Sequence, residues 1–433
     1  MTTARCHSAA TAAAVAACAL LTLAPATGAA QTGQTCQSWE GGFVYDAKLS
    51  VAGNAPLAVI RVIDPEKLLA VPTDNPAAVR TLPLLASGFE LASAPASQLL
   101  VTTNDLKGAV SGLRLASDGS PRGAAFTIYP AGAKDRVIRR VLFDGLDFVV
   151  VVDTGSSTAQ ELWLQRVGTD GVVAGDAAAL VVAEDALLLP GPASGMIWVL
   201  EDRNESLPGR VVARLRAADG AFGGAIDVGT GRVRGAAVAA NGDLLVVRKA
   251  DGASEELVTS VVAGAGTIST AVPFAAPGSA ALTGYWLVAA RPAGGFMAAT
   301  SMTDSAGTTL AGMALDASGT PSSAPAAWTS GMNARLAGDR LVFIDRVEAG
   351  DTATSHASAI AFDAAGAPGA PAVLTELRQT RRMYACSKGG CSVASPAPGE
   401  AGRASVLLIW GLAVITAVVV RRRAGPRTEL RRD

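Results

Sequence analysis

Short apolar runs alternate with polar, glycine-containing turns along most of this chain. The runs are four to seven residues long and bounded by Gly, Asp and Asn, which is typical of β-strands. No sustained helical period occurs between Gln31 and Tyr384, so the pattern predicts an all-β fold. The runs are Leu57–Ile63, Leu99–Thr103, Phe148–Val152, Ile197–Leu200, Leu244–Val247, Phe296–Ala299 and Leu341–Ile344.

A turn motif recurs with the same spacing as these runs. It is a turn with Asp-Gly or a near equivalent, as in Leu113–Gly123 (LRLASDGSPRG) and Leu162–Val172 (LWLQRVGTDGV). Asp-Gly between apolar runs is a strong hairpin signal, because the turn needs positive φ. The turn position falls at Asn75, Gly119, Gly171, Gly220, Gly266, Gly319 and Gly366, at intervals of 44, 52, 49, 46, 53 and 47 residues.

A repeat of about this length with roughly four short strands is typical of a β-propeller blade. Seven copies predict seven blades, although weak first and fourth copies also allow six. Tandem β-sandwiches with a chance rhythm are the alternative. We therefore expect an all-β, six- or seven-bladed propeller-like domain over residues 31–385.

The two ends of the chain have the pattern of export signals. Residues 1–30 combine Arg5, an apolar stretch and a small-residue cleavage site, which predicts a signal peptide. A Pro/Gly-rich spacer follows the domain at residues 386–403. The uncharged residues 404–420 predict a transmembrane helix of about 25 Å. Residues 421–433 begin with Arg421, Arg422 and Arg423, a membrane stop that places this tail in the cytoplasm.

This end resembles the myxobacterial C-terminal sorting tail (MYXO-CTERM), a family that pairs a signature Cys with an apolar helix and an Arg cluster. Gly389-Gly390-Cys391-Ser392 and the segments after it follow that order. The resemblance implies processing near Cys391 by an envelope sorting protease, lipid attachment there and display on the cell surface. It says nothing about the domain outside the membrane.

Cysteine usage fits an exported chain. Signal removal leaves Cys36, Cys386 and Cys391. In an oxidising compartment Cys36 and Cys386 can form a disulfide that joins the first and last blades, and Cys391 then stays free for sorting or lipidation. The rival pairing of Cys386 with Cys391 would close only a small loop.

Charge narrows the range of partners. The whole chain carries −1, the signal contributes +1 and the tail +4, which leaves −6 for residues 31–420. A mildly acidic body argues against nucleic-acid binding, which needs clustered Lys and Arg. We expect the membrane as a partner, whereas the sequence does not identify a protein or glycan ligand.

Few residues suggest catalysis. Asp153-Thr154-Gly155-Ser156-Ser157 is similar to an aspartic-protease loop, but that chemistry needs a second such loop and the chain has none. The repeat predicts a hairpin turn there instead. After signal removal His356 is the only histidine, and it falls in the polar stretch 351–358, where we expect a turn. We predict no catalytic, cofactor or metal site, although calcium held by carbonyls stays open.

These observations favour a surface-displayed, non-enzymatic propeller that offers a rigid binding platform. The alternative is an extracellular carbohydrate-active enzyme with two carboxylates about 5–10 Å apart in the propeller channel. A structural envelope protein is a third hypothesis. A channel lined by Ala, Val and Ser would favour the platform.

Overall fold

The computed structural model describes residues 35–385 apart from 54, 105–107, 133–135, 154–160, 182–184, 204–208, 251–255, 276–284 and 305–306. Two compact units divide the chain. Residues 39–381 form one, and residues 1–38 with 382–433 form the other. Of the second unit the structure describes residues 35–38 and 382–385, which belong to two strands. Within the described residues, no helix is long and apolar enough to cross a membrane.

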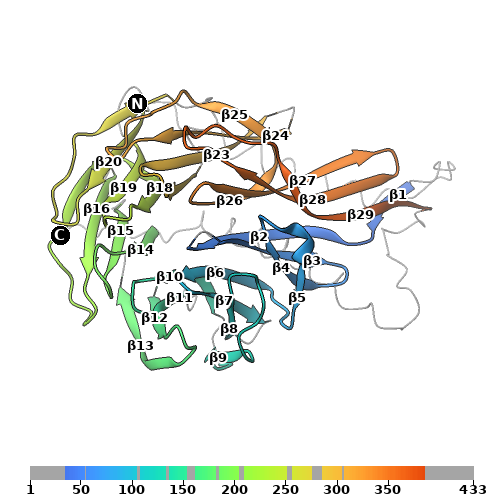
Figure 1. Cartoon of the computed structure of the whole chain (residues 1–433), viewed down its shortest axis with the longest axis horizontal. Coiled ribbons are helices and arrows are strands. Elements are labelled where there is room, and N and C mark those ends of the chain that lie inside the picture. Colours follow the sequence, from blue (N-terminus) through green and yellow to red (C-terminus); the bar gives the residue numbers. More distant parts are fainter. Residues whose placement is uncertain are drawn as a thin grey trace, which may run out of the picture. The chain divides into compact units, whose positions relative to one another are not determined.

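The described strands form seven antiparallel sheets, numbered here as blades 1 to 7 in chain order. Their first strands contact one another in succession, and β2 contacts β26, so the sheets close a ring around a common centre (Figure 1). The prediction of a propeller is confirmed, with seven blades rather than six. Blades 1 to 3 are β2 (Phe43–Ala52), β3 (Ala55–Ile63), β4 (Lys67–Pro72) and β5 (Arg80–Leu82); β6 (Gly88–Ala94), β7 (Ser97–Asn104), β8 (Ala109–Leu115) and β9 (Phe126–Tyr129); and β10 (Val137–Phe143), β11 (Phe148–Asp153), β12 (Glu161–Val167) and β13 (Val173–Val181).

The later blades repeat this plan, with one extra strand in the last. Blades 4 to 6 are β14 (Asp185–Pro190), β15 (Ile197–Arg203), β16 (Arg210–Arg216) and β17 (Ile226–Thr230); β18 (Arg232–Val238), β19 (Leu244–Lys249), β20 (Leu257–Val262) and β21 (Val272–Phe274); and β22 (Trp286–Ala290), β23 (Phe296–Asp304), β24 (Gly307–Leu315) and β25 (Ala326–Ser330). Blade 7 is β26 (Met332–Ala337), β27 (Arg340–Ala349), β28 (Thr352–Ala361) and β29 (Ala372–Ala385), with β1 (Thr35–Glu40) as a fifth strand beside β29.

Strand β1 therefore carries the beginning of the described chain to the outer edge of the last blade. Its Trp39 is held between two cations: the guanidinium groups of Arg346 and Arg381 lie 5.0 and 5.1 Å from the ring centroid. Such contacts contribute about 0.5–1 kcal/mol each at exposed sites. The ring is thus closed by backbone pairing and by side-chain stacking.

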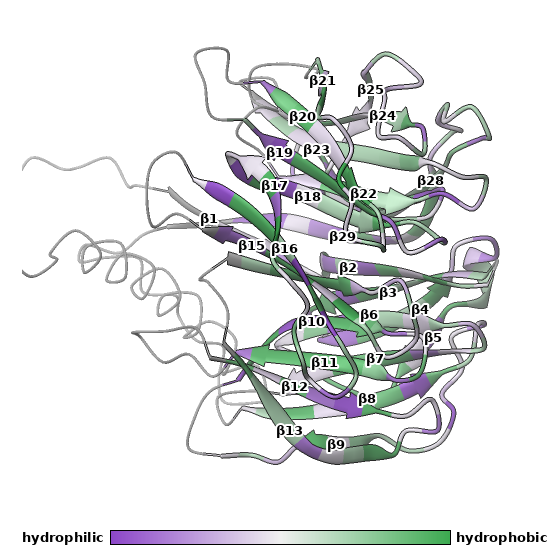
Figure 2. Ribbon diagram, turned by 90° about the vertical axis from the view of Figure 1, so that its left-hand side faces the viewer, coloured by the Kyte–Doolittle hydropathy of each residue, from purple (hydrophilic) through white to green (hydrophobic). Residues whose placement is uncertain are grey.

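The apolar runs of the sequence are the second strands of the blades, and they form the core. All six residues of β11 are buried, and Figure 2 shows this strand as hydrophobic along most of its length. Apolar clusters lie between neighbouring sheets. One of them joins Leu99 and Val101 of blade 2 to Phe148 and Val150 of blade 3. Alternate residues of a strand face opposite sides of its sheet, so a run packed on both sides must be apolar throughout.

Six of the seven expected turn positions are glycines with positive φ, between +78° and +91°. They are Gly119, Gly171, Gly220, Gly266, Gly319 and Gly366, each between the third and fourth strands of its blade. The seventh position, Asn75, differs, because it precedes a 3₁₀ turn at Pro76–Ala78 and has φ −144°. The repeat was therefore predicted correctly, apart from the turn of its first copy.

These turns touch the preceding blade. A Cβ on Gly366 would lie 2.6 Å from the Cβ of Ala314 in blade 6, and one on Gly119 would lie 2.9 Å from the Cβ of Ala70 in blade 1. Gly171, Gly266 and Gly319 likewise face side chains of the blade before their own. Glycine at these positions supplies the backbone conformation and also the room for close packing.

Candidate functional site

A pocket of about 500 Å³ lies on the axis of the ring, because the first strands of all seven blades contribute to it. Its volume is in the range of small-molecule and peptide sites. The lining comprises Lys48 and Leu49, Glu90 and Leu91, Arg140 and Val141, Ala186 and Leu187, Arg232–Ala236, Tyr285–Val288, Arg335 and Leu336, with Leu200 and Asp202 from β15.

The lining has a surplus of positive charge. Five cationic side chains, those of Lys48, Arg140, Arg232, Arg234 and Arg335, face two carboxylates. This surplus differs from both channel linings considered from the sequence, a small-residue wall and a wall with a carboxylate pair. An anion, or the anionic end of a larger molecule, is the ligand that such a site favours.

Irregular pairing in the first strands brings several of these charges to the channel. The register between β10 and β11 shifts between Ile138 and Arg140, and a similar shift occurs in β2 just before Asp46. The shift in β18 leaves out Arg234, and the one in β26 ends at Arg335. A bulge of this kind re-aims the side chains after it. The bulges thus let an otherwise alternating strand direct long cations to the axis.

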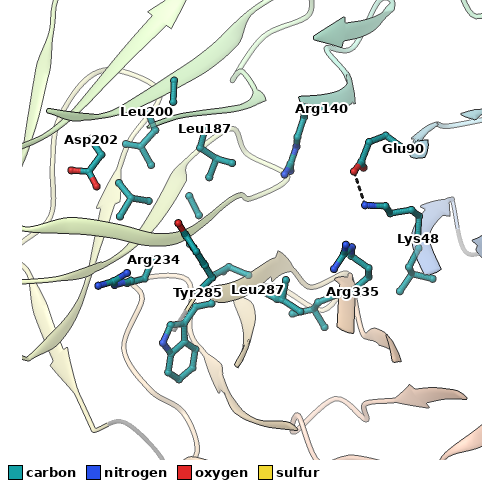
Figure 3. A pocket seen from close by; sticks show the side chains of 18 of the residues that line it. Lys48, Glu90, Arg140, Leu187, Leu200, Asp202, Arg234, Tyr285, Leu287 and Arg335 are labelled. Carbon is teal, nitrogen blue, oxygen red and sulfur yellow. Dashed lines mark hydrogen bonds and ion pairs between the residues drawn. The ribbon is translucent and has the colours of Figure 1, made fainter. Parts of the chain in front are cut away.

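Blades 7, 1 and 2 share an ion-pair network. Nζ of Lys48 lies 2.6 Å from Oε1 of Glu90 and 3.7 Å from Oδ2 of Asp46. Asp46 also lies 3.6 Å from Nη2 of Arg335 through Oδ1. Figure 3 shows the Lys48–Glu90 pair at one side of the pocket. Two of the cations are therefore already balanced by protein carboxylates.

Arg140, like Arg232 and Arg234, is not balanced in this way. Its half-buried side chain points into the pocket (Figure 3), and among the described residues it has no hydrogen-bond or ion-pair partner. Burial lowers the pKa of Arg140, and the negative charge of Glu90 acts in the opposite direction. An arginine stays protonated in proteins, so a charged guanidinium faces the cavity without a partner.

The other side of the pocket combines apolar and aromatic residues with one charge of each sign. Leu187 and Leu287 are half-buried there, and the side chain of Tyr285 is 77% exposed. Figure 3 places Asp202 and Arg234 on this side, away from the Lys48–Glu90 pair. The two lining carboxylates thus lie at opposite sides of the pocket, an arrangement that gives no support to the carbohydrate-active alternative.

The structure corrects the expectation for His356. The residue lies within β28 rather than in a turn, because β27 and β28 extend as a long hairpin of ten residues each. Its Nδ1 is 2.5 Å from Oδ1 of Asp345, and its Nε2 is 3.6 Å from Glu376. The hydroxyl of Ser358 donates to Asp345, not to the imidazole. His356 is thus flanked by carboxylates, whereas a Ser-His-Asp triad would need a serine at Nε2.

Other residues singled out in the sequence take no part in this pocket. Asp153 is the last residue of β11, buried, with its carboxylate 2.5 Å from Nη2 of Arg139. Cys36 lies in β1. Cys386, Cys391, Arg421, Arg422 and Arg423 lie outside the described residues, as do the signal and transmembrane segments. In the described part of the chain, no cluster of three or more His, Cys, Asp or Glu side chains could hold a metal ion.

The pocket residues were missed in the sequence because the repeat was traced through the second strands. A signal was nevertheless present. Lys48, Glu90 and Arg140 each stand 11 residues before their pairing partners in the second strand, which are Val59, Val101 and Val151. This constant offset places the three charges at one level of the channel.

The chain has similar structures among known proteins but no match in sequence. No family model matches the chain, and no curated protein matches it in sequence. Among solved structures, puromycin hydrolase has a TM-score of 0.50 at 17% identity over 75% of this chain. The likeness establishes a propeller fold. The chain spans 52% of puromycin hydrolase, about half its length.

Two further structures belong to peptide-cleaving proteins. The β-propeller domain of the Trilobed protease from Pyrococcus furiosus matches with a TM-score of 0.48 at 10% identity, over 78% of this chain and 98% of that domain. Pyrococcus horikoshii acylaminoacyl peptidase matches with a TM-score of 0.48 at 10% identity, over 77% and 52% of the two chains. The prediction of a non-enzymatic binding platform is contradicted by the likeness to puromycin hydrolase, and we do not retain it.

Proposed function

We propose that this chain is a peptidase-type propeller that admits peptides to its axial pocket and serves their hydrolysis. The observation that carries the proposal is the pocket itself, which combines a surplus of cations with apolar and aromatic residues. A peptide presents both kinds of group on one backbone. The class of substrate comes from the names of the solved neighbours, a puromycin hydrolase, a protease and an acylaminoacyl peptidase.

Within this proposal the described residues bind and orient the peptide. His356, the one histidine among them, is flanked by Asp345 and Glu376 and lies away from the pocket lining. We therefore assign bond cleavage to a catalytic unit that acts together with the propeller. The axial position suits this division, because a pocket of about 500 Å³ is far smaller than a folded protein.

Peptide binding tests the proposal directly. The full-length protein is titrated with fluorescein-labelled peptides of mixed sequence, and anisotropy is recorded. Tyr285→Ala should weaken binding by about fivefold or more, because the loss of one aromatic contact at a binding site costs about 1 kcal/mol or more. Tyr45→Ala is the matched control, since Tyr45 is also exposed, at 50%, but lies outside the pocket lining.

The outcomes separate cleanly. Saturable binding that Tyr285→Ala weakens and Tyr45→Ala leaves unchanged supports the proposal. Absence of binding for every peptide, or equal loss in both variants, would overturn it. In a parallel assay with internally quenched peptides this chain alone should give no cleavage, and cleavage by it would overturn the assignment of catalysis to a separate unit.

We also propose export and membrane anchoring of the propeller, supported by the sequence pattern of residues 1–30 and 404–433. Cys36 and Cys386 would form the closing disulfide and Cys391 the lipid-modified end. Peptide mass mapping under non-reducing conditions, on protein from separated membrane fractions, tests each part. Detection of Cys36 as a free thiol would refute the disulfide, and a tail intact to Asp433 would refute sorting.

A further inference from the structure

Three of the five pocket cations have no partner among the described residues. Lys48 and Arg335 each pair with a protein carboxylate, whereas Arg140, Arg232 and Arg234 do not. Arg232 is exposed, and Arg140 points into the pocket (Figure 3). Arg234 lies on the Asp202 side of the pocket, away from Arg140 (Figure 3). A guanidinium taken partly out of water without a hydrogen-bond partner is unfavourable even with the charge of Glu90 acting on it, and a carboxylate on a ligand would relieve that cost.

The geometry points to a specific ligand group. We infer that Arg140 receives the free C-terminal carboxylate of a peptide whose last residue is apolar. The inference rests on the proposed function and names the end of the peptide that the pocket selects. A guanidinium fork matches a carboxylate with two parallel hydrogen bonds, so one arginine is sufficient to hold the group.

The rest of the pocket fits the terminal residue. Leu187 and Leu287 offer an apolar wall, and Tyr285 adds an exposed ring. In a C-terminal residue the carboxylate and the side chain are bonded to the same carbon atom. The carboxylate can therefore bind the cation while the side chain contacts the apolar wall of the same cavity. An acidic side chain would need a second, apolar residue to reach that wall.

The axial position favours a chain end for a further reason. The first strands of all seven blades surround the pocket, so the middle of a peptide would have to thread the ring. An end needs only to enter from one side. Glu90 pairs with Lys48 and its charge also acts on Arg140, so it would repel any further anionic group of the ligand.

Matched peptides test the inference. Hexapeptides with fluorescein at the N-terminus and identical first five residues end in Leu as the free acid, Leu as the amide, or Lys as the free acid. Anisotropy with the full-length protein should give binding of the Leu acid at least tenfold tighter than that of the Leu amide. The Lys acid should bind several-fold more weakly than the Leu acid.

Variants locate the carboxylate. In Arg140→Gln the acid and the amide should bind equally, and Arg140→Lys should keep part of the preference, because the charge remains and the fork is lost. Arg122→Gln is the matched control, since Arg122 is exposed and outside the pocket lining, and it should keep the full preference. Circular dichroism and melting temperature confirm that each variant is folded.

Failure of the inference and failure of the proposed function are distinguishable. If acid and amide bind the wild type equally, or if Arg140→Gln and Arg140→Lys keep the tenfold preference, the inference is overturned and peptide binding stands. If no peptide binds the wild type, the proposed function itself is overturned.

Discussion

The packing of a turn glycine against the preceding blade allows a quantitative test of how the ring is held. Gly366 has φ +84°, and a Cβ there would lie 2.6 Å from the Cβ of Ala314. Both groups are rigid, so the turn or blade 6 must shift. Gly350 has φ +59°, and a Cβ there would meet no atom within 4 Å. The two positions share the backbone strain and differ in the contact.

The expected magnitudes follow from these distances. Gly350→Ala should lower the free energy of unfolding by about 1–2 kcal/mol, the cost of a left-handed conformation for an L-residue. Gly366→Ala should lower it by about 2–5 kcal/mol, because overpacking adds roughly 1–3 kcal/mol. Guanidinium denaturation followed by tryptophan fluorescence measures both, with circular dichroism as a second probe of two-state behaviour.

A double-mutant cycle isolates the contact. Ala314→Gly removes the Cβ that the new methyl group would strike, so the loss in the double variant Gly366→Ala/Ala314→Gly should be smaller than the sum of the single losses by about 1 kcal/mol or more. Equal losses for Gly366→Ala and Gly350→Ala, or strict additivity in the cycle, would refute the view that the turn glycine is required by the neighbouring blade.

Three other predictions concern acid stability, ring closure and pocket charge. Hydrogen bonds led by that of a serine hydroxyl lower the pKa of Asp316 below its ordinary value of 3.8, so its carboxylate stabilises the fold above that pH and the contribution disappears as pH falls through the lowered value. Asp316→Asn should therefore cost less than about 1 kcal/mol at pH 7, as expected for an exposed group, and still less in acid; a larger cost in acid would reverse the sign. Trp39→Ala should lower the free energy of unfolding by about 1–2 kcal/mol through loss of two cation–π contacts, and Trp39→Phe should lower it less. Glu90→Gln removes one of the two carboxylates beside Lys48 and should tighten binding of peptide acids several-fold, with weaker binding as the contrary result.

Much of the fold could be predicted because second strands are buried on both faces. Runs such as Phe148–Val152 must be apolar throughout, and the turn glycines must adopt positive φ, so both leave marks in the sequence. The first copy was harder to place, since Asn75 precedes a 3₁₀ turn instead of a glycine turn. The blade count became certain only with the pairing of every strand.

The candidate site could not be predicted in the same way. First strands face an axial pocket, so core packing does not determine which polar residues they carry. Bulges before Asp46 and Arg140 also break the two-residue period of these strands. The small and polar neighbours of His356 predict a turn. His356 lies in a strand because the β27–β28 hairpin continues beyond the buried part of the blade.

Most of the turns contact the blade before their own, and these contacts have a consequence for how such a chain can be rearranged. Blade 1 makes a comparable contact with blade 7, where Asp74 lies 3.0 Å from Nη2 of Arg340, and Arg166 of blade 3 donates to the carbonyl of Gly195 in blade 4. The succession of neighbours is thus circular and has no privileged starting blade. A permuted gene that joins the propeller's termini and opens the chain between two other blades would preserve every neighbour relation. Insertion of a further blade would enlarge the ring, and each blade would still contact its two neighbours in the same way.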